Sequence, residues 1–179
     1  RTKIIPTTLL NEMKGITAVA TLYMDDGSLM LTHRINHQKK VIYVTPHVAL
    51  FVQNFTKGEL TALKSWIDDI TNVSLSLTKR PDGHGFYLRT TKVKDTLQFL
   101  EAIAPVTRTC PSMYYKTNWA YRCQQERKKW EKKYQGYQVR VSHPERTKRY
   151  TAEEIERIQQ MKRERITDQQ IADALGRTY

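Results

Sequence analysis

The acidic pair Asp25-Asp26 lies directly before Gly27, at the end of a mostly apolar run that begins at Gly15. The spacing of the apolar residues in this run predicts a largely buried helix that ends at Gly27, a typical residue for a helix C-cap. A helix C-terminus already carries partial negative charge, so a carboxylate there is best explained by a nearby cation. Carboxylate oxygens suit Mg²⁺. The residues alone leave two interpretations open: a divalent-metal site, or a polar turn after a core helix.

The elements that position this pair follow from hydrophobic periodicity and turn residues. Residues 2–10 are expected to form an extended lead-in, because Pro6 restricts the backbone. Pro46 predicts a bend or bulge within its strand, and Thr56 with Glu59 forms a capping box that opens a helix. The predicted order is α-β-β-α-β-β-α, with a helix at 15–26, strands at 29–36 and 41–53, a helix from 56, strands at 73–79 and 86–89, and a helix at 93–103.

The charge of the chain indicates a polyanionic partner. Its 179 residues carry a formal net charge of +12, and residues 108–165 hold 16 Lys or Arg against 7 Asp or Glu. Such a surplus favours nucleic acid through counterion release. No apolar run approaches the ~20 residues that span a bilayer, so no membrane partner is expected. Cys110 and Cys123 lack the spacing of metal ligands and no disulfide-rich context surrounds them, which favours a reducing cytoplasm. The expected location is the cytosol, for a protein encoded by a bacterium or a phage, and an organelle is the alternative.

The stretch Val19–Gly27 (VATLYMDDG) resembles the LAGLIDADG motif of homing endonucleases, in the variant found in two-motif members. Three further runs follow in the family's order: Lys3-Ile4-Ile5-Pro6, Gln53-Asn54-Phe55-Thr56-Lys57 and Pro111-Ser112-Met113-Tyr114-Tyr115-Lys116. The resemblance covers about residues 3–117. It implies an α+β, homing-endonuclease-like αββαββα fold with a twisted antiparallel DNA-binding sheet. Thr21, where many members have Gly, and Met24 depart from the name motif but occur in the variant group.

The resemblance also implies an active site. Asp26 is expected to bind Mg²⁺ or another divalent cation, assisted by the Gly27 carbonyl, and Lys116 is expected to support the attacking water or the phosphate charge. The implied activity is sequence-specific double-strand DNA cleavage by metal-dependent phosphodiester hydrolysis. The family needs two motif helices, so the expected partner is a second half, either a missing N-terminal half or a homodimer mate. The predicted interface residues of the motif helix are Ile16, Ala20, Tyr23 and Met24.

Alternation along the strands predicts which side chains point away from the core and towards double-stranded DNA. These outward positions are Thr32, Arg34, Asn36, Ser74, Ser76, Thr78, Tyr87 and Arg89. By the family resemblance, Lys79 and Arg80 lie near the position of another polar active-site residue. They are therefore included among the residues expected to contact DNA. The basic segment after Lys116 is expected to contact phosphates. Its candidate residues are Arg127, Lys128, Lys129, Lys132 and Lys133.

Three segments are expected: a LAGLIDADG-like domain at 1–116, a basic helical extension and linker at 117–148, and a small helical tail at 149–179. Helices predicted at 151–163 and 168–175 resemble the start of a helix-turn-helix, which stops where a recognition helix begins. This tail supports an alternative function, a non-catalytic DNA-binding transcriptional regulator. An RNA-binding intron maturase is a less favoured alternative. Retention of Asp26 and Lys116 favours the nuclease.

Overall fold

The computed structural model describes residues 4–13, 15–142 and 150–175, and the chain divides into two compact units, Arg1–Pro144 and Glu145–Tyr179. Unit 1 contains the expected α-β-β-α-β-β-α order, and the mixed α+β class is confirmed. The boundary expected after Lys116 is wrong, because the segment that follows packs onto the sheet of unit 1. Residues 143–148 of the expected linker lie outside the described residues.

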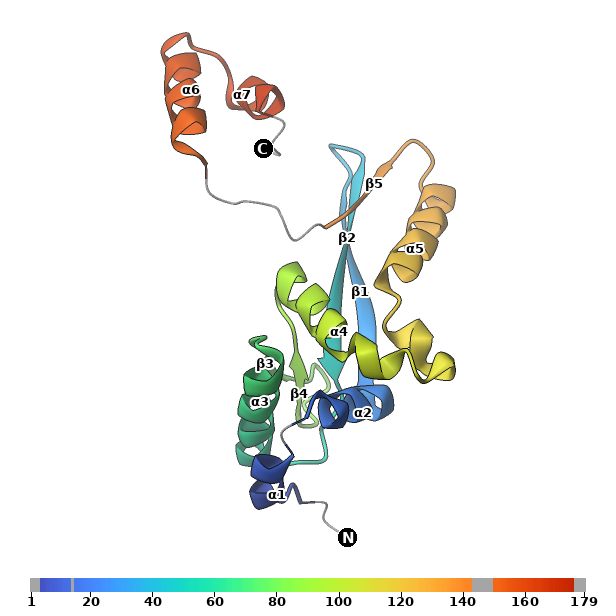
Figure 1. Cartoon of the computed structure of the whole chain (residues 1–179). Helices are drawn as coiled ribbons and strands as arrows, with labels where there is room; N and C mark the ends of the chain where they lie inside the picture. Colours follow the sequence, from blue (N-terminus) through green and yellow to red (C-terminus); the bar gives the residue numbers. More distant parts are fainter. Residues whose placement is uncertain (1–3, 14, 143–149, 176–179) are drawn as a thin grey trace. The chain divides into compact units, whose positions relative to one another are not determined.

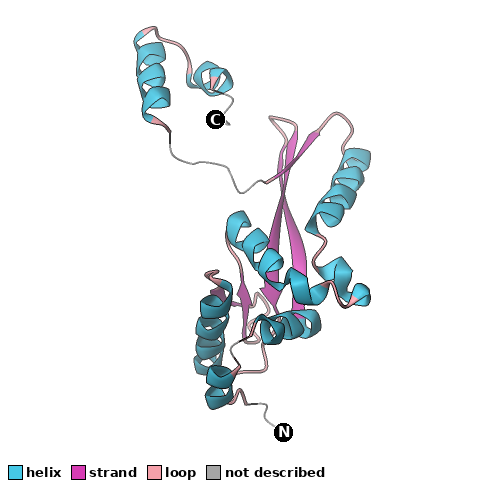
Figure 2. Cartoon of the chain, in the orientation of Figure 1, coloured by secondary structure: helices cyan, strands magenta, loops and turns pink. Residues whose placement is uncertain are grey.

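A long twisted hairpin forms the centre of unit 1 (Figures 1 and 2). Its strands β1 (Gly27–Asn36) and β2 (Val41–Leu50) pair antiparallel in unbroken register, from Gly27 opposite Leu50 to Asn36 opposite Val41. Two short strands, β3 (Ser76–Lys79) and β4 (Phe86–Arg89), complete the antiparallel order β1-β2-β4-β3. A fifth strand, β5 (Gln138–Val141), pairs parallel with β2. This strand was not predicted, because it lies in the segment expected to be a basic helix.

Pro46 does not bend β2, contrary to expectation, and it pairs with Leu31 in the regular ladder. The neighbouring residues explain this. The Val44 carbonyl accepts the Ser142 amide, and the Val48 carbonyl accepts the Thr90 amide, so the backbone groups of alternate residues of β2 point away from β1. Pro46 alternates in step with Val44 and Val48, so its backbone groups also point away from β1. It lies between the stretches of β2 that pair with β5 and β4. Its missing N–H therefore costs no ladder hydrogen bond.

The helices of unit 1 begin and end close to their predicted positions. Thr56 and Glu59 form the predicted capping box at the start of α3, each side chain bonding the other's backbone amide. The lead-in is not wholly extended, because Pro6 precedes a short helix whose Leu10 is buried in the core. The helices are α1 (Thr7–Glu12), α2 (Ile16–Asp26), α3 (Lys57–Thr71), α4 (Val93–Thr107), the 3₁₀ helix η1 (Pro111–Lys116) and α5 (Trp119–Lys133).

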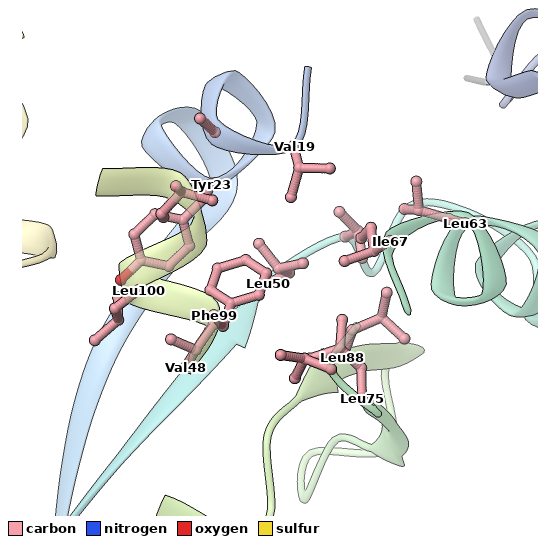
Figure 3. Close-up of a cluster of buried hydrophobic side chains, with 14 of the residues drawn as sticks. Val19, Tyr23, Val48, Leu50, Leu63, Ile67, Leu75, Leu88, Phe99 and Leu100 are labelled. Carbon is pink, nitrogen blue, oxygen red and sulfur yellow. The ribbon is translucent and has the colours of Figure 1, made fainter. Parts of the chain in front are cut away.

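Two hydrophobic clusters lie on one face of the sheet. The larger joins α2, α3 and α4 to the sheet, and Tyr23 and Phe99 meet edge to face in it with ring centroids 5.5 Å apart (Figure 3). The smaller fixes α5, because Trp130 packs with Ile42 and Val44 of β2 and with Val139 of β5. Since these β2 residues alternate in phase with Val48 and Leu50 of the larger cluster, the helices cover the same face of the sheet.

Unit 2 contains the two predicted helices, α6 (Ala152–Arg163) and α7 (Asp168–Ala174). Thr151 and Glu154 form a second capping box at the start of α6. The Thr167 hydroxyl accepts the Gln170 amide at 3.4 Å and so caps the start of α7. The run after Leu175, where a recognition helix was expected to begin, lies outside the described residues.

Candidate metal and nucleic-acid site

The candidate metal ligand Asp26 is the last residue of α2, and β1 begins at the next residue without a connecting loop. Both Asp25 and Asp26 are exposed. The Asp26 carbonyl accepts the Phe51 amide at 2.8 Å, which ties the end of the helix to the far end of the hairpin. Asp26 therefore presents its carboxylate from a backbone that is fixed on both sides.

Gly27 ends α2 as predicted, but not as a left-handed cap, because its φ of −90° and ψ of 156° are those of a strand. Glycine is required for another reason. A Cβ at this position would lie 2.2 Å from Cδ2 of the Tyr23 ring and 2.4 Å from the Tyr23 carbonyl oxygen. The absence of a side chain therefore lets the chain turn from helix to strand directly over a buried tyrosine.

Lys116 comes from a distant part of the sequence to the same end of α2. Its ammonium donates to the Met24 carbonyl at 2.5 Å and to the Asp25 carbonyl at 3.3 Å. The Tyr23 hydroxyl donates in return to the Lys116 carbonyl at 2.7 Å. A cation at a helix C-terminus is favourable, because it bonds carbonyls that have no partner within the helix. Lys116 thus has a definite structural role beside Asp26.

Tyr23 is enclosed by these contacts and by the core. Burial raises the pKa of its hydroxyl far above the usual value, and the positive charge of Arg122 opposes this only in part. Arg122 extends from α5 and donates to the Leu29 carbonyl at 2.8 Å. The end of α2, the start of β1 and the start of α5 are therefore held together at one place.

The oxygen donors at this place suit a hard cation but make an incomplete site. Asp26 offers a carboxylate, and alternation directs the Gly27 carbonyl, like that of Leu29, to the edge of β1 away from β2. Both are ligands that Mg²⁺ accepts. Among the described residues, no group of three or more His, Cys, Asp or Glu side chains is arranged to hold a metal. In the described part of the chain, the candidate donors at this place are therefore one carboxylate and one main-chain carbonyl.

The face of α2 expected to meet a second helix needs correction. Ala20 and Tyr23 are fully buried in this chain's own core, and Ile16 packs against the same cluster. Met24 is only half-buried. The exposed positions of α2 are instead Thr17, Thr21, Asp25 and Asp26, and the first three recur every four residues and therefore lie along one side of the helix.

The face of the sheet opposite the helices, the outer face, carries polar side chains along its whole length. Seven of the eight residues predicted to point outward lie on strands, and the registers place all seven on this face. Ser74 is exposed but precedes β3. None of the outward strand positions among the described residues is acidic. These positions are Ser28, Met30, Thr32, Arg34, Asn36, Val41, Tyr43, Thr45, His47, Ala49, Ser76, Thr78, Tyr87, Arg89, Gln138 and Arg140.

Six outer-face residues with polar groups were not predicted: Ser28 on β1, Tyr43, Thr45 and His47 on β2, and Gln138 and Arg140 on β5. On β2 a usable signal existed, because polar and apolar residues alternate from Ile42 to Val48. For β5 the two-residue alternation was too short to stand out beside a basic helix. Burial lowers the pKa of His47, and the charge of the nearby Arg89 lowers it further. The Arg89 Nε is buried without a hydrogen-bond partner in the described part of the chain.

Some predicted contact residues already have other partners. Arg80 pairs with Asp82 in the turn between β3 and β4, with Nη2 2.5 Å from Oδ2. This pairing and the His84 amide lower the pKa of Asp82 to about 2. Asn36 accepts the Lys39 amide at 2.9 Å and closes the hairpin turn. Lys79 lies two residues after Leu77 on β3, so its side chain points to the helix side of the sheet and not to the outer face.

The basic residues predicted to contact phosphates lie on α5, which covers the helix side of the sheet and not the outer face. Trp130 packs α5 against the helix side of β2 and β5, so the helix and the outer face are on opposite sides of the sheet. Arg127 donates to the Val139 carbonyl at 3.1 Å, and Lys129 pairs with Glu126 at 2.8 Å. Lys133 lies over the Trp130 ring, 5.2 Å from its centroid. Lys128 and Lys132 are exposed.

Over the described residues, none of the helices is both long and apolar enough to cross a membrane. The chain matches no protein-family model, and it matches no curated protein. Among solved structures it is similar to the homing endonuclease I-WcaI bound to its DNA recognition sequence, with a TM-score of 0.47 and 23% identity. The match covers 64% of this chain and 46% of that chain, so this chain spans less than half of its structural neighbour.

Proposed function

We propose that this chain is one half of a metal-dependent double-strand DNA endonuclease of the LAGLIDADG type. One observation carries the proposal: an exposed Asp26 stands where the motif helix enters a polar sheet that has no outward acidic strand residue in its described part. Lys116, 90 positions later in the sequence, reaches the same helix end. Placing a carboxylate and a cation beside a polar, net basic sheet face is chemistry suited to a phosphodiester substrate.

Asp26 and the Gly27 carbonyl are the proposed metal donors of this half. A bound Mg²⁺ would activate a water molecule and neutralise charge on the leaving oxygen. The Lys116 ammonium bonds the carbonyls of Met24 and Asp25 and thereby holds the helix end that carries Asp26. Its positive charge also favours the approach of a phosphate to this end of the helix.

The second half is proposed to supply the missing acidic ligand. The exposed side of α2 formed by Thr17, Thr21 and Asp25 is the surface that another motif helix can approach. Threonine and alanine side chains are short enough for two helices to pack closely, and Ala18 lies beside this line, only partly buried. The partner helix belongs either to a preceding half of the same protein or to a second copy.

The test is plasmid cleavage in Mg²⁺ by the protein together with its second half, compared with the Asp26→Asn variant. We expect linear product from the wild type and a loss of more than about a hundredfold in the variant, because even outer-shell partners of a metal are worth about 10–100-fold. DNA binding should persist in the variant. Asp69→Asn is the matched control, since Asp69 is an exposed carboxylate on α3, a helix that carries none of the proposed metal donors, and this variant should still cut. Equal cutting by wild type and Asp26→Asn contradicts the proposal.

A non-cutting DNA-binding regulator is the second candidate. The observation that favours it is unit 2, where α6 and α7 are each capped at the start and joined by a short turn, as in the first two helices of a helix-turn-helix. The same assay separates the two functions. A regulator binds duplex DNA and leaves it intact in Mg²⁺, whether Asp26 is present or not.

A further inference from the structure

The short strand β5 adds residues to the outer face at the end of the hairpin far from Asp26. Its pairing with β2 is fixed by the Gln138 amide, which donates to the Lys40 carbonyl at 2.8 Å, and by the Ser142 amide, which donates to that of Val44 at 2.8 Å. Val139 is buried under Trp130 on the helix side. Gln138 and Arg140, which alternate with Val139, therefore face outward, and both are exposed.

Hydrogen bonds of side chains agree with this direction. The Ser142 hydroxyl, in phase with Gln138 and Arg140, lies 2.8 Å from the hydroxyl of Thr45, an outer-face residue. The Arg140 Nε donates to the Gln138 Oε1 at 2.9 Å. This bond orients the guanidinium and leaves its two terminal amino groups without a partner in the part of the chain that the structure describes. A planar fork with two available donors is a typical ligand for a planar acceptor pair.

Arg140 also belongs to a row of side chains across three strands. The registers place Arg34 opposite Tyr43 and Tyr43 beside Arg140, so two arginines flank one tyrosine. No outward strand residue in the described part of the sheet is acidic, so neither arginine has a carboxylate beside it on that part of the outer face. Two positive charges on a polar surface favour an anionic ligand.

We infer that β5 extends the DNA-contacting surface and that Arg140, oriented by Gln138, binds a base edge in the major groove, preferably guanine. The inference rests on the proposed function for its partner, duplex DNA. Arginine binds the O6 and N7 acceptors of guanine with two parallel hydrogen bonds. An arginine that only neutralised a phosphate would gain little from the support of a neighbouring carboxamide.

The register also sets where on the duplex this contact falls. Arg89 pairs with Ala49 and Arg140 with Tyr43, six positions apart on β2. Six strand residues span about 20 Å at about 3.4 Å each, which corresponds to about six base pairs of B-DNA at about 3.4 Å per pair. Arg140 is therefore expected to affect base pairs about six positions farther out than those near Arg89.

The experiment is selection of bound duplexes from a randomised DNA library by the full chain and by its variants. We expect Arg140→Ala to lower the preference at one or two outer base pairs by roughly tenfold. Arg89→Ala should alter a separate region about six base pairs inward. Arg140→Lys keeps the charge but not the fork, so it should lose the base preference while keeping most of the affinity. Gln138→Ala should weaken the same outer preference to a smaller extent.

Lys94→Ala is the matched control, because it removes one exposed positive charge from α4, on the helix side of the sheet, and should leave every base preference unchanged. A uniform loss of affinity in Arg140→Ala, with its sequence preference intact, indicates a phosphate contact and overturns the inference. The inference is also overturned if Arg140→Ala selects the same sequences as the wild type. If the wild type binds no duplex at all, the proposed function fails, and this inference fails with it. Thermal unfolding of Arg140→Ala, expected to match the wild type, verifies that β5 remains in place.

Discussion

At the scale of single residues, the site shows how one contact gives a side chain a role that its type does not reveal. The family resemblance predicts that Lys116 supports a water or a phosphate beside the candidate ligand Asp26, and in the structure its ammonium bonds the carbonyls of Met24 and Asp25. Gly27 was expected to cap a helix through its backbone freedom, yet it is needed because Tyr23 leaves no room for a Cβ. In both cases the neighbour decides the role.

His47 gives a prediction of pH dependence at this scale. Its pKa in the folded protein is lowered by burial and by Arg89, so the unfolded chain binds the proton more tightly. Stability therefore rises with pH through this window and is fully present above about pH 6.5, the ordinary pKa of histidine. We expect the unfolding temperature to fall by a few degrees as the pH drops below that value. In His47→Gln this part of the pH dependence should disappear, as measured by calorimetry from pH 5 to 8. An unchanged slope contradicts the assignment.

At the scale of elements, α5 and β5 form one structural addition to the sheet. Trp130 connects them, since it contacts Ile42 and Val44 of β2 as well as Val139 of β5. The ring also lies 4.3 Å from the ring of His33, measured between centroids, so the hairpin is held on both of its strands. Lys128 and Lys132 lie on the exposed side of the helix, while Gln138 and Arg140 of the strand lie on the outer face of the sheet.

Trp130→Ala tests this connection. Removing a large buried side chain should cost about 3–5 kcal/mol of stability, and the loss should be concentrated at α5 and β5. Hydrogen exchange is the measurement: the amides of Gln138 and Ser142, which donate to β2, should lose protection. The amides of α2 and α4 should keep theirs, because the larger cluster contains no residue of α5 among its fully buried members. Lys128→Ala, on the exposed side of the same helix, is the control. Uniform loss of protection contradicts the prediction.

At the scale of the whole molecule, the chain consists of two compact units, Arg1–Pro144 and Glu145–Tyr179. Both hydrophobic clusters lie within residues 1–144, and so do Asp26, Lys116 and the outer face. Unit 2 contributes two capped helices with few buried residues, Ile171 and Ala172 being its buried apolar members. The larger unit therefore contains what its own folding requires.

A chain that ends at residue 144 should fold without unit 2. We expect its unfolding temperature to lie within a few degrees of that of the full chain, because no core residue is removed. Circular dichroism with thermal unfolding is the measurement, and the near-ultraviolet signal of Trp119 and Trp130 reports whether the smaller cluster is intact. Loss of cooperative unfolding in the shorter chain contradicts this expectation.

Local patterns in the sequence determined most of the elements. The capping box at Thr56 and Glu59 and the spacing of Leu60, Leu63 and Ile67 fixed α3, because both depend on residues within one helical turn. Alternation likewise assigned the outward side chains of β1, β3 and β4. The motif and its surrounding runs pointed to Asp26 as the residue at the end of a buried helix.

Only the tertiary structure decided which distant segments meet. Gln138 pairs beside Val41 and Lys116 reaches Met24, contacts across 97 and 92 positions of sequence. Four residues of alternation in β5, from Gln138 to Val141, carry too little information to specify a partner strand. Whether Ala20 faces its own core or a second helix also depends on how α4 and the sheet close over α2, where several packings share one helical pattern. The periodicity of a helix predicts that one of its faces is buried. Which element that face packs against depends on the packing of the whole chain.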